Sequence, residues 1–375
     1  MPFMKINIST SNSDESLRKE VNNRIDLIMK RCHIIQNCLF LRSCAKNSAG
    51  YCCLSFVQKT ILIVITVFLL LTIAINMLQA APRFSIALFI LLFDFLLLMF
   101  WNCVKEEEKF FKCILKTSNG YSIVRNTKHI LRISNSILIS SSLMTLLLIS
   151  LYAGNATYVM VTTPHLGTKE YLLVVSSLAF LILSISSVSI NSEFAALLTI
   201  LSAQFTTLSK DFGSDGNSSQ VVVVKHYMRA HVRLCILARS LSKFVSLWFS
   251  VKLVLCLTLC HMLLFNHNFP PRELAVFVVL VFYTFLTLFA FSIFCLRLHE
   301  DMRSFCKKIM HLAVSDKILH EQSYWVCQIY TENFRHEKFG INLFLVFPFT
   351  GHILATILIG FLVLNYFCAV ILWNK

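Results

Sequence analysis

Hydrophobic residues occur along this chain in blocks of about 20 positions, separated by shorter polar segments. A block of about this length allows an α-helix to cross the hydrocarbon core of a bilayer, which is about 30 Å thick. The pattern predicts an all-α polytopic membrane protein with a polar N-terminal tail, residues 1–60, followed by one seven-helix domain, residues 61–375. The predicted spans, in chain order, are 61–78, 84–104, 134–153, 171–190, 241–265, 274–296 and 347–373.

Composition agrees with a membrane protein. Hydrophobic residues account for 57% of the 375 positions and charged residues for 14%, and the mean hydropathy is +0.70. A soluble globular protein is about half apolar and about one quarter charged. Because so few charged residues remain to cover a water-exposed surface, the composition excludes a soluble protein.

The basic residues predict the orientation of the helices, because Lys and Arg accumulate on the cytoplasmic side of membrane spans. Of the 34 basic residues, 28 lie in the N-terminal tail or after the second, fourth and sixth spans, whereas four lie on the opposite side. We therefore expect a cytoplasmic N-terminus and, with seven crossings, an extracellular C-terminus. This orientation is expected of a multi-pass protein of the plasma membrane.

The same distribution explains the formal net charge of +15. Basic segments beside membrane helices face the anionic lipids of the cytoplasmic leaflet. We therefore expect the lipid bilayer, and not nucleic acid, to be the partner of these positive charges.

The predicted outer loops contain one modification signal and no cysteine. Asn155 begins an Asn-Ala-Thr sequon for N-glycosylation in the loop after the third span. None of the 14 cysteines falls in the outer loops, so no extracellular disulfide is expected. Cys52 and Cys53 precede the first span, where either reduced thiols or palmitoylation fits. No spacing of Cys, His or acidic residues predicts a metal site, and no cofactor is expected.

Several other classes of membrane protein fit poorly. G-protein-coupled receptors also have seven helices, but their termini lie on the opposite sides, and their Asp-Arg-Tyr and Asn-Pro-x-x-Tyr motifs are missing here. His311 and Asp316 fit the His-x4-Asp pattern of membrane acyltransferases, yet the other sequence blocks of those enzymes are absent, so no enzyme is expected. A secondary transporter is the alternative function, although no hydropathy repeat relates the two halves.

Apolar stripes at helical spacing continue past three of the spans on the cytoplasmic side. These amphipathic stretches are too charged to cross a membrane, and they prolong membrane helices directly. We expect them to pack together as a helical bundle beneath the membrane; the alternative is that they lie flat on the anionic leaflet. The stripes comprise Phe194, Leu197, Leu198, Leu201 and Phe205; Tyr227, Val232, Leu234, Ile236, Leu237 and Leu241; Phe305, Ile309, Leu312 and Ala313; and Trp325, Val326, Ile329 and Tyr330.

The last hydrophobic segment, residues 341–373, is too long for one span. A continuous helix of this length measures about 50 Å at about 1.5 Å per residue, against about 30 Å of hydrocarbon. Pro348 and Gly351 divide it, and we expect a short inner helix over 341–349 and an outer spanning helix over 352–373. The outer helix is expected to pack against copies of itself about a symmetry axis.

The end of the chain resembles the insect gustatory and odorant receptors, which are seven-span proteins with cytoplasmic N-termini. Gustatory receptors finish in Thr-Tyr, five hydrophobic residues and then Gln-Phe. This chain finishes in Asn365-Tyr366, five hydrophobic residues and then Leu372-Trp373. The run of His and Leu from His231 and the stretch FGINLFL at 339–345 are similar to the approaches to the fifth and seventh helices of that family.

The resemblance implies a chemosensory, taste-type receptor that works as a tetrameric ligand-gated cation channel, either homomeric or with related subunits. In that family the outer part of the seventh helix lines the pore, so the implied pore-lining residues are Asn365, Tyr366, Ala369 and Leu372. Leu372 stands where the family has a polar Gln, and a pore ringed by leucine dewets easily. A relative that has lost channel activity is therefore a second alternative.

Two charged residues lie inside predicted spans, where insertion of a charge costs about 2.5–3.5 kcal/mol and usually serves a purpose. Asp94 and Lys252 either pair with one another, or Lys252 faces a ligand pocket, or the two side chains reach a cavity or the membrane surface. His261, near the outer end of the fifth span, is a second ligand-pocket candidate for a small-molecule tastant. Its alternative is an ordinary position at the membrane interface.

Overall fold

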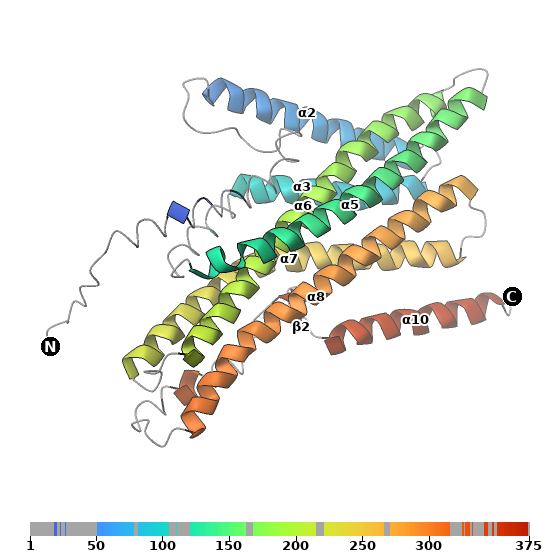
Figure 1. Ribbon diagram of the computed structural model, residues 1–375. Helices are drawn as coiled ribbons and strands as arrows, with labels where there is room; N and C mark the ends of the chain where they lie inside the picture. The colour runs from blue at the N-terminus through green and yellow to red at the C-terminus, as the bar shows by residue number, and fades with distance from the viewer. Residues whose placement is uncertain are drawn as a thin grey trace.

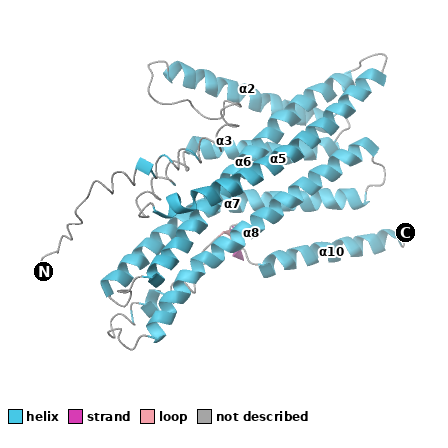
Figure 2. Ribbon diagram, in the orientation of Figure 1, coloured by secondary structure: helices cyan, strands magenta, loops and turns pink. Residues whose placement is uncertain are grey.

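A computed structural model describes most of the helical part of the chain. The described residues are 51–78, 82–104, 121–162, 168–214, 221–265, 271–315, 341–343, 347–348 and 351–373, with the isolated positions 19, 20, 23, 27, 110, 325, 327–330 and 332. Almost all of them are helical (Figures 1 and 2), so the predicted all-α fold is confirmed. The helices are α2 (Tyr51–Leu78), α3 (Pro82–Val104), α5 (Tyr121–Thr162), α6 (Thr168–Ser214), α7 (Val221–Phe265), α8 (Pro271–Ser315) and α10 (Gly351–Trp373).

Four stretches of the described residues are long and apolar enough to cross a membrane by length and composition. They are His129–Leu151, Ala179–Phe212, Val224–Leu264 and Leu274–His311. Shorter apolar stretches occur in the other three helices, at Ile63–Thr72, Leu91–Asn102 and Gly351–Val363. The exact limits of the seven spans remain predictions, as does the division of the chain at residue 60.

Helix α6 is the centre of the bundle, and α5, α3, α8, α7 and α2 all contact it. Its middle is rich in serine, and Ser184, Ser186, Ser187 and Ser189 are all buried. Small residues let neighbouring helices approach closely within a membrane, and a serine hydroxyl can satisfy itself on its own helix. Ser186 does this by donating to the carbonyl oxygen of Ile182 at 2.9 Å. The serine run therefore makes α6 the helix around which the others pack.

The predicted packing of the helical extensions into a bundle is confirmed; the position of this bundle beneath the membrane remains a prediction. Helices α6, α7 and α8 extend together well past the remaining helices, toward the lower left of Figure 1. Their extensions share a second hydrophobic cluster, separate from the main core. Its buried members are Phe212, Val224, Met228, Phe305, Ile309 and Cys327.

Not every residue of the predicted stripes faces this bundle. Ile236 and Ile329 are 63% and 58% exposed, and Val232 and Trp325 are exposed as well. An apolar stripe at helical spacing is wider than the surface that its neighbours cover, so its edges stay open. Leu312, Ala313 and Val326 lie outside the described side chains.

The predicted short inner helix over 341–349 is wrong. Asn342–Leu343 (β1) and Phe347–Pro348 (β2) instead pair as an antiparallel ribbon, drawn in magenta in Figure 2, with Asn342 opposite Pro348. Proline disfavours the helical conformation of the residue before it and has no N–H to donate. The ribbon is held to α7, where the hydroxyl of Ser246 donates to the carbonyl oxygen of Asn342.

The glycosylation sequon also lies in a different setting from the expected loop. Helix α5 continues to Thr162, so Asn155 belongs to its last turns. The hydroxyl of Thr157 donates to the carbonyl oxygen of Ala153 at 2.9 Å, which is a contact within the helix. A sequon is used most readily in a surface loop; glycosylation of Asn155 itself remains a prediction.

Candidate functional site

The two charged residues inside the predicted spans form an ion pair. The ammonium of Lys252, on α7, lies 2.6 Å from the Oδ2 atom of Asp94, on α3. Both side chains are buried, with at most 1% of their surface exposed. An unpaired charge at this depth would be strongly unfavourable, so each residue requires the other. This arrangement is the pairing alternative of the sequence analysis; a ligand contact by Lys252 remains a prediction.

Trp248 completes the surroundings of this pair. Its Nε1 atom donates to the second carboxylate oxygen of Asp94 at 3.0 Å. The ammonium of Lys252 also lies 5.1 Å from the centre of the Trp248 ring, a distance typical of a cation–π contact. Because Lys252 follows Trp248 by one helical turn, the two side chains share one face of α7 and reach Asp94 together.

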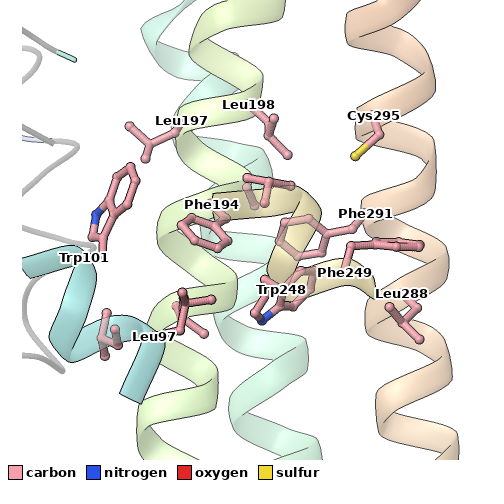
Figure 3. Close-up of a cluster of buried hydrophobic side chains, with 14 of the residues drawn as sticks. Leu97, Trp101, Phe194, Leu197, Leu198, Trp248, Phe249, Leu288, Phe291 and Cys295 are labelled. Carbon is pink, nitrogen blue, oxygen red and sulfur yellow. The ribbon is translucent and has the colours of Figure 1, made fainter. Parts of the chain in front are cut away.

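A layer of aromatic rings seals the apolar side of Trp248 (Figure 3). The ring of Phe291 on α8 is 4.5 Å away, and that of Phe194 on α6 is 6.1 Å away in an edge-to-face arrangement. All three side chains are fully buried. The rings remove water from the neighbourhood of the ion pair, which strengthens the attraction between its charges.

The polar contacts continue from Lys252 to α6 and α8. The ammonium donates to the hydroxyl of Ser187 at 3.3 Å, and the Ser187 oxygen lies 3.3 Å from the hydroxyl of Tyr283. Asn191 donates to the same Tyr283 oxygen at 2.9 Å. We call Asp94, Trp248, Lys252, Ser187, Asn191 and Tyr283 the central polar network. It joins four helices in the middle of the bundle.

Sequence reasoning identified only the two charged members of this network. Ser187 and Asn191 carried a usable signal, since they belong to a run of polar residues inside a hydrophobic block, SISSVSINSE. Tyr283 and Trp248 carried none, because isolated aromatic residues are common in membrane helices. A second buried contact was missed in the same way: the Nε1 atom of Trp101 donates to Oε1 of Glu193 at 2.6 Å.

The other ligand-pocket candidate contacts the last helix. The Nδ1 atom of His261, on α7, lies 2.9 Å from Oδ1 of Asn365, on α10. The amide nitrogen of Asn365 donates to the carbonyl oxygen of Phe361 at 2.8 Å, so Oδ1 is the acceptor and His261 donates from Nδ1. Asn365 is 7% exposed. The contact couples the C-terminal part of α7 to the predicted pore helix.

The neighbouring Tyr366 points away from this contact. Its side chain is 67% exposed, as are the large apolar residues Ile359 and Leu362 on the same helix, at 60% and 67%. In Figure 1, α10 runs along the edge of the bundle, with its C-terminal end on the same side as the C-terminal end of α7 and the N-terminal end of α8. Ala369 and Leu372 belong to α10, but their side chains lie outside the described ones.

A third polar cluster, centred on His231, lies in the bundle beneath the predicted spans. The Nε2 atom of His231 lies 3.1 Å from the carbonyl oxygen of Met302, so it carries the proton and donates. The hydroxyl of Tyr330 lies 2.5 Å from Nδ1 and donates to it. Burial lowers the pKa of His231 to about 4, while the contact with Met302 opposes this shift. Burial raises the pKa of Tyr330, which keeps its hydroxyl a donor.

Comparison with known proteins gives a structural likeness without a sequence match. No protein-family model matches the chain, and no curated protein matches its sequence. Among solved structures, the insect olfactory receptor OR5 from Machilis hrabei superposes with a TM-score of 0.70 at 12% identity, over 92% of this chain and 99% of that one. The complex of the same receptor with eugenol gives a TM-score of 0.66 at 12% identity, over 95% and 99%. The chain therefore has the fold of an insect olfactory receptor.

Proposed function

We propose that this protein is a chemosensory receptor of the taste type that opens a cation-conducting pore when it binds a small organic molecule. The observation that carries the proposal is the whole-chain likeness to an insect olfactory receptor, of which a complex with eugenol is known. The resemblance of the chain end to gustatory receptors favours a tastant as the ligand. The proposal also takes up the predicted orientation, with the C-terminus outside the plasma membrane.

The pore is proposed to form from four copies of α10 around a common axis, in a homomer or with related subunits. The exposure of Tyr366, Ile359 and Leu362 supports this arrangement, because it leaves one face of α10 open to another protein chain. Lipid would satisfy the same face in a monomer, so exposure by itself does not require an oligomer. Tyr366 lies on that face, and Tyr366, Ala369 and Leu372, spaced i, i+3 and i+6, are the residues proposed to point toward the axis.

Asn365 has a separate part in this proposal. Its contact with His261 holds α10 against α7 in the arrangement described here. Breaking that contact would free the Asn365 amide, and a small rotation of α10 would bring it toward the pore beside Tyr366. Asn365 would then supply the permeating ions with a polar group that Leu372 does not offer.

The experiment that tests the proposal is recording from cells that express the full chain during exposure to a panel of small organic molecules, eugenol included. Tyr366→Cys is the informative variant, with a charged thiol reagent applied from outside. A ligand-evoked cation current that the reagent blocks only in this variant supports the pore assignment. Thr258→Cys is the matched control, since Thr258 is exposed on α7 and bonds only to its own helix.

Leu372 stands where gustatory receptors have Gln, and this difference favours a second candidate function. In it, the protein is receptor-like, binds its ligand and does not conduct ions. Replacing Leu372 with Gln restores the polar residue that gustatory receptors have there. A current that appears only in Leu372→Gln would support this second candidate. Solute flux without any channel current, in both the wild-type protein and Leu372→Gln, would instead favour a secondary transporter.

A further inference from the structure

A cavity of about 160 Å³ lies between α5, α6 and α8, near the ends of the predicted membrane spans on α5 and α8. It is remote from the central polar network, and α10 contributes nothing to its described lining. Cavities that enclose drug-sized ligands usually measure about 300–1,000 Å³. This cavity lies below that range, so it would take in part of a ligand, such as some of the polar groups of a headgroup, and leave the rest of the ligand outside.

The cavity wall on α6 contains hydroxyl groups that already donate their hydrogen atoms to other residues. Thr199 donates to the carbonyl oxygen of Ala195 at 2.7 Å, and Thr206 donates to that of Ser202 at 3.0 Å. Ser202 donates its own proton to Asp301. Each hydroxyl oxygen keeps lone pairs, so this wall accepts hydrogen bonds. A ligand that fits it must carry donors, as a polyol does.

The rest of the lining includes basic side chains. Lys210 from α6, Arg297 from α8 and His129 from α5 line the cavity, and all three residues are exposed. Neither Lys210 nor Arg297 forms an ion pair with another residue that the structure describes. Asp211 also lines the cavity, so the site is not suited to a simple inorganic anion. Cations and hydroxyl acceptors side by side match a ligand that carries phosphate and hydroxyl groups together.

We propose that this cavity binds a phosphorylated polyol of the inositol phosphate type. Its hydroxyl groups would donate to Thr199, Ser202 and Thr206, and a phosphate would lie between Lys210 and Arg297, where arginine offers paired donors. The 28 basic residues assign this end of the bundle to the cytoplasmic side, and basic pockets between helices at that level suit phosphoinositide headgroups. The inference depends on that orientation and is independent of any channel activity.

The test uses purified full-length protein in two arms. In one arm, nanodiscs of phosphatidylcholine with or without phosphatidylinositol 4,5-bisphosphate are analysed for bound lipid by native mass spectrometry. In the other, the protein in detergent is titrated with inositol 1,4,5-trisphosphate or with inorganic phosphate. Binding in the first arm alone identifies a membrane lipid as the ligand. Binding in both arms shows that the inositol phosphate headgroup is sufficient for binding. Binding in neither arm, or equal affinity for inorganic phosphate, overturns the proposal.

The variants separate a built site from general attraction to anionic lipid. Lys210→Gln with Arg297→Gln is expected to weaken binding about twenty-fivefold, about fivefold for each charge removed. The matched control is Arg303→Gln with Lys307→Gln, which removes the same charge from exposed positions on α8 outside the cavity. Equal weakening by both pairs contradicts the proposal. Thr206→Leu fills the cavity without changing charge, and it should also abolish binding while the protein remains monodisperse.

Discussion

The imidazole of His261 donates a hydrogen bond to the side-chain oxygen of Asn365 at 2.9 Å, and so fastens α7 to α10. The two helices touch at few other places. An α10 that lines a pore must move when the pore opens, whereas α7 is anchored in the core by Trp248 and Lys252. In the proposed channel, this contact therefore lies between the helix anchored in the core and the helix that moves when the pore opens.

Replacing His261 with Leu is expected to raise the current in the absence of ligand about fivefold. One hydrogen bond contributes about 0.5–1.5 kcal/mol, and its loss favours the arrangement in which α10 is released. Asn365→Leu removes the same bond and should also raise this current, but by less, because it also removes the amide that is proposed to face the permeating ions. The measurement is basal current normalised to surface expression.

The double variant, His261→Leu with Asn365→Leu, distinguishes this contact from unrelated disturbances. It should open the pore no more than either single change, because residues joined by one bond show non-additive effects. Thr258→Val is the control on the same helix, one turn earlier, and should leave the basal current unchanged. Additive effects of the two single changes would refute the coupling.

Lys252→Met is expected to destabilise the protein by about 3–5 kcal/mol, because it leaves the charge of Asp94 buried without a partner. Asp94→Asn should act similarly, and Asp94→Leu combined with Lys252→Met should recover most of the loss. Thermal unfolding in a single detergent measures all three. Lys243→Met is the matched control, since Lys243 is an exposed lysine on the same helix.

The same series separates a structural role for Lys252 from a ligand role. If Lys252→Met is as stable as Lys243→Met and has lost only its response to ligand, the ion pair is dispensable and Lys252 belongs to a ligand pocket. Retention of the ligand response in the double variant would instead assign Lys252 to the core.

Acidification should destabilise the bundle formed by the extensions of α6, α7 and α8 through His231. The folded protein holds the pKa of this residue at about 4, whereas an unfolded chain has a histidine pKa of about 6.5. The unfolded state therefore binds more protons between these values, and stability falls as the pH drops from about 6.5 to about 4. The full loss is about 3 kcal/mol. Protonation of Nδ1 also removes the acceptor that Tyr330 uses.

Unfolding midpoints at pH 7.5 and pH 5.0 measure this effect. His231→Gln should show a smaller difference between the two midpoints than the wild-type protein, because glutamine does not titrate. His226→Gln, at an exposed position on the same helix, should behave as the wild type does. An unchanged difference in His231→Gln would mean that other groups cause the acid sensitivity.

An epitope tag placed after Lys375 should be stained on intact cells, since the distribution of basic residues predicts an extracellular C-terminus. A tag before Met1 is the control and should be stained only after permeabilisation. A C-terminal tag that needs permeabilisation, on protein shown independently to reach the surface, would rule out the receptor-channel proposal and favour a transporter.

Much of the fold could be predicted because its signals are local. Hydrophobic blocks long enough to span a bilayer specify helices, and apolar stripes beyond the membrane specified the extensions of α6, α7 and α8. The predicted short helix before α10 was wrong because that prediction also used only local signals. Residues 341–349 are apolar enough for a helix, but Pro348 and the contact of Asn342 with Ser246 favour the ribbon.

The sequence by itself determined that the chain is a helical membrane protein, which residues fill its hydrophobic blocks and which buried charges need partners. Only the tertiary structure decided the partners: Trp248 meets Asp94 across 154 positions, and His261 meets Asn365 across 104. The reason is physical. Hydrophobicity sets how deeply a helix lies in the bilayer, but the face that a residue presents to a neighbour depends on how whole helices pack around the small serine residues of α6.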